Sequence, residues 1–130
     1  LALSEVDCPV ITAAYAGGAH ADLMSAHVVK AVLDGRRRAL YFSRSPIPWA
    51  NNPREQGYLQ HVGIYAMRIE TLKRFVSWKP GPLETLERLE QLRFLENGVC
   101  VYVADSTEPS FGVDVPEDIA RIEAMMGENE

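Results

Sequence analysis

Two charged side chains fall on the side of a predicted helix where apolar residues are expected. Pro82–Asn97 (PLETLERLEQLRFLEN) begins with proline and is followed by Gly98, a pattern typical of an α-helix. At helical spacing one arc holds the apolar residues Leu83, Leu86, Leu89 and Phe94. Glu90 and Arg93 point into the same arc, so they form either an internal ion pair or part of a binding site. Gln91 points off the arc and is the weaker candidate.

Arg44 lies in YFSRSPIPW, where a predicted strand meets a proline-rich loop. Side chains at such junctions often project into clefts. A guanidinium in this position could bind a carboxylate or a phosphate bidentately. The alternative is an ordinary solvated arginine at the edge of a loop.

His61 and Tyr65 belong to the strand-like segment LQHVGIYAMR. Side chains alternate along a strand, so these two share a face, and Gly63 between them leaves a bare patch. A small ligand could lie across that patch. The alternative is a buried, hydrogen-bonded histidine in an ordinary strand.

Asp114 precedes a predicted helix in FGVDVPED. An aspartate there is often a cap or turn residue, and it could instead be a ligand for hydrated Mg²⁺. Glu117 and Asp118 suit the positive end of the helix dipole better than a metal. One carboxylate does not make a magnesium site, and the sequence shows no convincing second ligand.

The remaining chain predicts an α/β fold. The expected strands are Val10–Tyr15, His27–Leu33, Ala39–Arg44, Tyr58–Arg68 and Val99–Ala104. The expected helices are Ile69–Trp78, Pro82–Asn97 and Pro116–Met126, with a helical turn at Ala21–Ser25. Asp34-Gly35 predicts a tight hairpin, and Ser45–Gly57, rich in proline, predicts a loop.

Composition narrows the class of protein. The 130 residues suffice for one domain or part of one, and the net charge of -5 argues against nucleic acid or an anionic membrane as the main partner. We see neither a signal peptide nor an apolar run long enough to span a membrane. Cys8 and Cys100 lack metal-ligand spacing, which predicts buried free thiols in a reducing cytosol, with a disulfide as the alternative.

Four segments, taken in order, resemble one family: YFSRSPIPW, LQHVGIYAMR, FVSWKPGPLETLERLEQLRFLENG and GVDVPED. They are similar to the C-terminal half of 3-deoxy-manno-octulosonate cytidylyltransferase, the CMP-Kdo synthetase. A weaker similarity extends upstream through VITAAY and HVVKAVLD. The resemblance implies the C-terminal half of a Rossmann-like nucleotide-diphospho-sugar transferase fold, with an antiparallel portion that builds a homodimer.

The same resemblance implies the activity and the site. The family joins Kdo to CTP, with Mg²⁺, to give CMP-Kdo and pyrophosphate for lipopolysaccharide biosynthesis in the cytoplasm. The positions that match its sugar-acid pocket are Arg44, His61, Tyr65, Glu90 and Gln91. Gln91 enters on the resemblance alone, and Asp114 matches the family's Mg²⁺-binding aspartate. No residue is assigned as catalytic with certainty.

The family's N-terminal half contains a basic glycine-rich loop that grasps the CTP phosphates and a QGDEP-like motif, and neither occurs here. We therefore expect residues 1–130 to form a single partial domain, the sugar-acid-binding and dimerisation half, inactive alone. One alternative is a non-catalytic dimerisation or sugar-acid-binding module. Another is a relative of the sialic-acid cytidylyltransferases, although the IPW and LEQLR segments favour Kdo.

Overall fold

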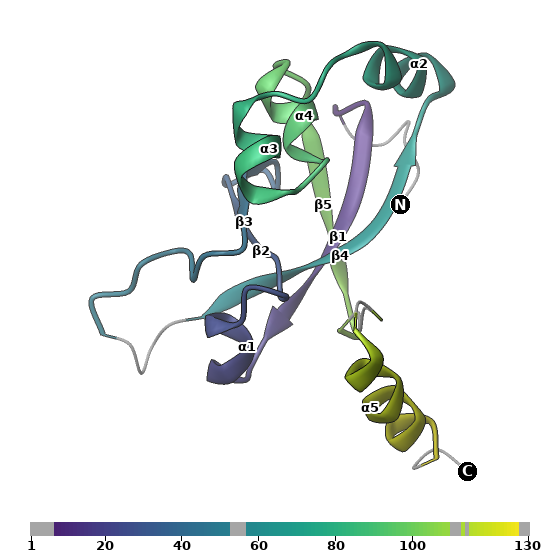
Figure 1. Ribbon diagram of the computed structural model, residues 1–130. Helices are drawn as coiled ribbons and strands as arrows, with labels where there is room; N and C mark the ends of the chain where they lie inside the picture. The colour runs from purple at the N-terminus through teal and green to yellow at the C-terminus, as the bar shows by residue number, and fades with distance from the viewer. Residues whose placement is uncertain (1–6, 53–56, 110–112, 114, 128–130) are drawn as a thin grey trace.

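A computed structural model describes residues 7–52, 57–109, 113 and 115–127. The strands are β1 (Val10–Gly17), β2 (Lys30–Leu33), β3 (Ala39–Ser43), β4 (Tyr58–Met67) and β5 (Val101–Ser106). The helices are α1 (His20–Met24), α2 (Ile69–Ser77), α3 (Pro82–Glu87), α4 (Leu92–Glu96) and α5 (Pro116–Gly127). The strands form one mixed sheet in the order β3-β2-β4-β1-β5 (Figure 1). The prediction of an α/β chain is therefore confirmed.

The long strand β1 lies inside the sheet, between β4 and β5. It runs antiparallel to β4 and parallel to β5, with Val10 opposite Val101. The core is formed by Val10, Ala14, Ala31, Phe42, Leu89, Leu92, Phe94, Val99, Val101 and Val103. Because β5 alternates buried and half-buried residues, it is covered less completely than its apolar sequence predicted.

The β2–β3 hairpin confirms the predicted turn, although its left-handed backbone conformation is not at the glycine. The turn is closed by hydrogen bonds from the Asp34 N–H to the Arg38 carbonyl (2.9 Å) and from the Arg37 N–H to the Asp34 carbonyl (3.0 Å). The left-handed residue is Arg37 (φ 62°) rather than Gly35. The Val103 N–H donates to the Arg37 carbonyl, so the tip of this hairpin covers the outer edge of β5.

A bulge interrupts β4 where it faces β1. Ile11 lies opposite Ala66 and Ala13 lies opposite Val62, so the single residue Thr12 faces residues 63–65. The Thr12 hydroxyl lies 2.8 Å from the Ile64 carbonyl oxygen and 3.1 Å from that of Val62. A side chain of β1 thus offers its hydroxyl proton to one of two backbone carbonyls at the bulge.

The predicted helix Pro82–Asn97 is wrong as a single element. Helix α3 ends at Glu87, the backbone of the following residue Arg88 is left-handed (φ 53°), and α4 begins at Leu92. The Arg44 guanidinium accounts for this break, because it donates to the Glu87 carbonyl (2.8 Å) and the Arg88 carbonyl (3.3 Å). As a result Leu86 is 80% exposed while Leu92 is fully buried.

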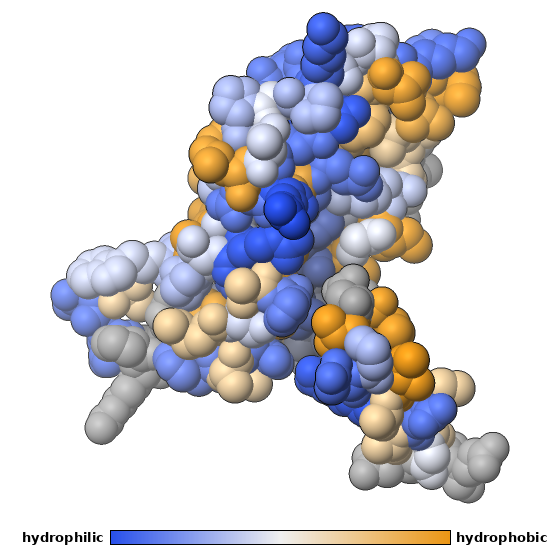
Figure 2. All heavy atoms as spheres, viewed as in Figure 1, coloured by the Kyte–Doolittle hydropathy of each residue, from blue (hydrophilic) through white to orange (hydrophobic). Residues whose placement is uncertain are grey.

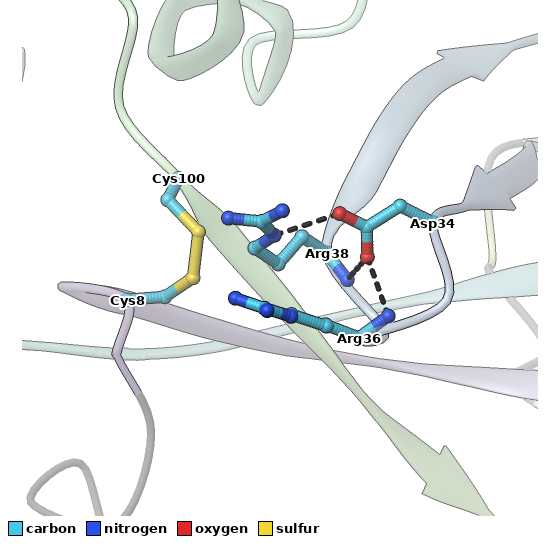
Figure 3. The surroundings of a disulfide bond; sticks show 5 residues. All are labelled: Cys8, Asp34, Arg36, Arg38 and Cys100. Carbon is cyan, nitrogen blue, oxygen red and sulfur yellow. Dashed lines mark hydrogen bonds and ion pairs between the residues drawn. A yellow bond between two sulfur atoms is a disulfide. The ribbon is translucent and has the colours of Figure 1, made fainter.

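The prediction of free thiols is also wrong, since Cys8 and Cys100 form a disulfide (Figure 3). The reason is topological. Parallel pairing of Val10 with Val101 brings the residues just before the two strands together, with their Cα atoms 5.1 Å apart. Linear spacing of 92 residues could not reveal that neighbourhood.

Apolar side chains remain at the surface on α2 and α5 (Figure 2). On α2, Ile69 and Val76 are 57% and 69% exposed, and on α5 Ile119 and Met126 are 49% and 68% exposed. Helix α5 lies beyond the end of β5, away from α2, α3 and α4 (Figure 1). Within the described ranges, no helix is long and apolar enough to cross a membrane.

Candidate functional site

His61 is the centre of the candidate site. It lies on β4 and is only 9% exposed. Its Nε2 atom lies 2.9 Å from Thr12 Oγ1, and its Nδ1 atom lies 3.5 Å from Gln91 Nε2. Burial lowers the pKa of His61 from 6.5 to about 4, so the ring is neutral near pH 7. A neutral, partnered imidazole is a hydrogen-bonding group rather than a cation.

Tyr65 shares a face of β4 with His61, but the bulge at residues 63–65 brings the two rings together, so they do not flank an open patch at Gly63. The His61 and Tyr65 ring centroids are 5.7 Å apart, and the Phe42 ring packs against His61 in a T-shaped arrangement at a centroid distance of 4.9 Å. Burial, followed by the negative charge of Glu90, raises the pKa of the Tyr65 phenol. Tyr65 therefore keeps its proton and can donate a hydrogen bond to a ligand oxygen.

Of the two alternatives for Glu90 and Arg93, the internal ion pair is not the one that the structure shows. Arg93 instead binds Glu84 bidentately, with Nε to Oε2 at 2.8 Å and Nη2 to Oε1 at 2.6 Å. The same guanidinium lies 4.4 Å from the centroid of the Phe75 ring. The break at Arg88 separates Glu90 from the apolar arc of a continuous helix and leaves it exposed. Arg93 is thus a structural residue.

The same break reverses the geometric interpretation of Gln91. Periodicity placed its side chain off the apolar arc, yet it is 4% exposed and reaches His61. Glu90 and Gln91 both line a surface hollow of about 430 Å³. Its other lining residues are Pro80, Glu84, Thr85, Arg88 and Leu89. His61 lies behind this hollow, in contact with Gln91.

Arg44 is held by backbone oxygens at the end of β3. Besides the carbonyls of Glu87 and Arg88, its Nη1 donates to the Ala26 carbonyl at 2.9 Å. These bonds fix the guanidinium plane and occupy part of its donor set. Arg44 thus lies on the α3 side of the sheet. Its contacts toward the candidate site are with the backbone carbonyls of Glu87 and Arg88.

Glu87 is a residue that sequence reasoning missed. Its carboxylate accepts hydrogen bonds from the Ser43 hydroxyl (2.6 Å), the Arg44 N–H (3.0 Å) and the Tyr41 hydroxyl (3.3 Å). Burial acts to raise the pKa of Glu87, but these hydrogen bonds and the charge of Arg44 outweigh it, so the pKa is lowered. The carboxylate and Arg44 together fasten the end of β3 to the end of α3.

Thr12 and Lys30 were missed as well, although the sequence contains a pattern that could have found them. Each interrupts an apolar, strand-like run with a polar side chain, in VITAAY and HVVKAVL. Lys30 is fully buried, and its Nζ donates to the carbonyls of Ser25 (2.8 Å), Val28 (2.6 Å) and Arg44 (2.5 Å). Burial, followed by the charge of Arg44, lowers the pKa of Lys30. A polar residue inside a buried strand must find such partners.

The metal prediction receives no support from the described part of the chain. Asp114, the proposed Mg²⁺ ligand, lies outside the described residues. Among those that are described, no group of three or more His, Cys, Asp or Glu side chains could hold a metal ion. Asp118 accepts a hydrogen bond from the Val115 N–H (3.1 Å), in keeping with its expected role at the start of α5.

The sequence and the fold agree with one protein family. Residues 12–109 match the family described as Cytidylyltransferase, so the chain belongs to that family. The first sequence relatives are named 3-deoxy-manno-octulosonate cytidylyltransferase, which confirms the resemblance seen in the sequence. The protein from Alcanivorax borkumensis is 42% identical over 131 residues, covering 93% of this chain and 52% of that protein. The one from Dichelobacter nodosus is 49% identical over 104 residues, covering 78% and 43%.

A solved structure gives the same result. It is that of CMP:2-keto-3-deoxy-manno-octonic acid synthetase complexed with CTP, with a TM-score of 0.86 and 35% sequence identity. The match covers 98% of this chain and 53% of that one. The chain therefore spans about half the length of the relatives it matches.

Proposed function

We propose that this chain is the sugar-acid-binding half of a 3-deoxy-manno-octulosonate cytidylyltransferase. The main support is the agreement of the fold with a CMP-Kdo synthetase complexed with CTP at 35% identity. In the proposed reaction the anomeric hydroxyl oxygen of Kdo bonds to the α-phosphorus of CTP. The bond from that phosphorus to the bridging oxygen breaks, pyrophosphate leaves, and the hydroxyl proton is released. The product would serve lipopolysaccharide biosynthesis in the cytoplasm.

The candidate site would contribute by positioning the nucleophile. Phosphoryl-type transfer depends mainly on orientation and charge neutralisation. Gln91 and Glu90 line the same hollow, and Tyr65 retains a phenolic proton beside His61. Donors and acceptors of this kind suit the several hydroxyl groups of a sugar acid. In this proposal the guanidinium of Arg44, already oriented by three carbonyls, provides the positive charge for the sugar carboxylate.

The isolated chain is proposed to be inactive. Its sequence lacks the basic glycine-rich loop with which the family grasps the CTP phosphates, and it lacks the QGDEP-like motif that carries another metal-binding aspartate. A pyrophosphate-release assay with CTP, Kdo and Mg²⁺ should show turnover by a protein that contains both halves and none by residues 1–130. Turnover with a sialic acid in place of Kdo would redirect the substrate assignment. Absence of turnover with either sugar acid by the longer protein would refute the proposed function.

Glu90 is the most informative residue of the site to substitute. It is exposed, so its removal should change the stability of the fold little. In the longer protein Glu90→Ala should lower kcat/KM for the sugar acid about tenfold or more, the size of one lost charged hydrogen bond. The matched control is Glu70→Ala, which removes an exposed glutamate from α2. Equal activity of the two variants would remove Glu90 from the site.

We also propose that Mg²⁺ supports the reaction and that Asp114 provides one of its ligands. The described residues do not supply a metal site, so this proposal depends on the match of GVDVPED to the family and on the hardness of a carboxylate ligand. Activity of the longer protein should disappear with a chelator and return with added Mg²⁺. Asp114→Asn should raise the Mg²⁺ concentration needed for half-maximal activity, whereas an unchanged requirement would exclude Asp114.

The homodimer expected from the resemblance remains a proposal, with a second copy of the chain as the partner. Its support is the apolar surface near the β2–β3 hairpin, where Leu40 is 60% exposed and Trp49 is 82% exposed. A neighbouring hollow of about 400 Å³ is mostly apolar and includes Val32, Leu33 and Pro48. Sedimentation equilibrium should show dimers that Trp49→Ser weakens, and a monomeric wild-type chain would contradict the proposal.

A further inference from the structure

We propose that Thr12 is a positioning residue, which sets the tautomer of His61 and thereby the orientation of the Gln91 carboxamide. Thr12 is 2% exposed and lies opposite the bulge in β4. Its Oγ1 atom is within hydrogen-bonding distance of two carbonyl oxygens, those of Val62 and Ile64, and of His61 Nε2. All three neighbours belong to β4.

The hydroxyl proton decides the direction of these bonds. A carbonyl oxygen can only accept, so the Thr12 hydroxyl donates its single proton to Ile64 (2.8 Å) or to Val62 (3.1 Å). Whichever carbonyl it chooses, no proton remains for His61. The 2.9 Å contact must therefore be a donation from His61 Nε2–H to the Thr12 oxygen. The neutral ring carries its proton on Nε2, and Nδ1 is an acceptor.

The tautomer of His61 in turn determines the orientation of the Gln91 carboxamide. An acceptor at His61 Nδ1 requires a donor opposite it, and the amide nitrogen of Gln91 lies there at 3.5 Å. The carboxamide oxygen is then directed away from the ring, where it can accept a hydrogen bond from another donor. Because Gln91 lines the hollow beside Glu90, the expected donor is a hydroxyl group of the ligand. With the other tautomer, the amide would turn and present its NH₂ group instead.

Ring packing restricts His61 to this arrangement. Phe42 and Tyr65 contact the imidazole at centroid distances of 4.9 Å and 5.7 Å, which disfavours rotation of the ring. Two nitrogen atoms then face two fixed partners. The choice of tautomer depends on Thr12, since the backbone carbonyls of the bulge fix the direction of its hydroxyl.

Long-range ¹H–¹⁵N correlation NMR of the chain tests the tautomer directly. Near pH 7, His61 should show a protonated Nε2 and an unprotonated Nδ1, assigned by comparison with His61→Gln. Thr12→Ser keeps the hydroxyl and should keep this pattern, whereas Thr12→Val should populate the Nδ1–H form. The control Thr71→Val makes the same change at another buried threonine, which is 5% exposed on α2, and should leave the His61 spectrum unchanged.

A wild-type His61 protonated on Nδ1 would overturn the proposal, and this result does not depend on whether any variant folds. An unchanged tautomer in folded Thr12→Val would overturn it as well. The link to ligand binding rests on the proposed function and has a separate test. In the longer protein Thr12→Val should raise KM for the sugar acid about tenfold with a smaller effect on kcat, and Thr12→Ser should restore KM to within about twofold. Wild-type enzyme without turnover would refute the function while leaving the NMR result intact.

Discussion

Arg93 forms a bidentate ion pair with Glu84, nine positions before it, across the break between α3 and α4. The side chains are only 15% and 10% exposed, and the guanidinium also covers the Phe75 ring. A buried charge that loses its partner is strongly destabilising. This pair therefore joins the two helices, while the neighbouring Glu90 remains available at the surface.

Removal of Glu84 should accordingly destabilise the chain. We expect Glu84→Ala to lower the free energy of unfolding by about 3 kcal/mol, because Arg93 would be left buried without its carboxylate. Glu90→Ala should change it by less than about 0.5 kcal/mol, as is usual for an exposed side chain. Urea denaturation monitored by tryptophan fluorescence measures both. A larger loss for Glu90→Ala than for Glu84→Ala would favour the Glu90–Arg93 ion pair that the sequence left as one of two alternatives.

His61 predicts a loss of stability on acidification. Its pKa is about 4 in the folded chain and near 6.5 when unfolded, so below pH 6.5 the unfolded state binds a proton that the folded state does not. The contribution of the neutral His61 to the free energy of unfolding is complete above pH 6.5 and is lost as the pH falls toward 4. The total is about 3 kcal/mol. Thr12, Gln91, Phe42 and Tyr65 face the ring, with the charge of Glu90 beyond Tyr65.

Urea denaturation at a series of pH values separates this effect from the titration of carboxylates. The difference in stability between wild type and His61→Gln should shrink as the pH falls from 6.5 to 4. His27→Gln, which removes an exposed histidine, is the control and should follow the wild type throughout. Parallel curves for wild type and His61→Gln would show that His61 titrates normally.

Sequence patterns were sufficient for the elements whose conformation is decided locally. The strands at Val10 and Tyr58, the hairpin at Asp34 and the helix at Pro116 begin where turn chemistry and periodicity placed them. The family resemblance grouped Gln91 with His61 among the pocket positions, and the structure places their side chains 3.5 Å apart, whereas periodicity had directed Gln91 away from the apolar arc. Turn chemistry and periodicity depend on residues that are close in the sequence, and the resemblance depends on short motifs. Neither requires knowledge of which distant segments are in contact.

What the sequence could not show depends on contacts between distant segments. Arg44 ends α3 by binding the carbonyls of Glu87 and Arg88, and no local propensity of PLETLERLEQ reports that event. The disulfide depends on the parallel pairing of β1 with β5. Thr12 and His61 meet because of a bulge whose position is a property of the strand pair. In each case tertiary structure overrides or adds to the local pattern.

The disulfide should contribute substantially to stability. It closes a loop of 92 residues, for which the chain-entropy model gives about 4.6 kcal/mol. Reduction with a dithiol should therefore lower the Tm of the chain, by about 10 °C or more. Thermal denaturation of oxidised, reduced and Cys8→Ser/Cys100→Ser protein provides the comparison, and the double variant should not respond to reductant. Two thiols that react with an alkylating reagent before reduction would contradict the disulfide and support the free cysteines first expected.

Glu87 should prove important for both the fold and the position of Arg44. Glu87→Ala removes the acceptor for Ser43, which is 2% exposed, and for the N–H of Arg44, so buried donors lose their partner. We expect a loss of about 2–3 kcal/mol in the free energy of unfolding. Glu87→Gln retains one amide oxygen as an acceptor and should lose less. Ser43→Ala removes two hydrogen bonds, the one to Glu87 and the one from the Ser45 N–H, and should lose about 1–2 kcal/mol.

The same variants distinguish a purely structural clamp from one that also orients the guanidinium. If Glu87 positions Arg44 for the sugar carboxylate, Glu87→Gln in the longer protein should raise KM for the sugar acid several-fold more than it lowers kcat. Ser43→Ala leaves the hydrogen bond from the Arg44 N–H to Glu87 in place and should leave KM close to that of the wild type. Equal KM values for Glu87→Gln and Ser43→Ala, together with the expected losses of stability, would confine Glu87 to the fold. Because Arg44 ends α3 through its bonds to the backbone there, any movement of its guanidinium should also shift the amide resonances of Leu89 and Glu90.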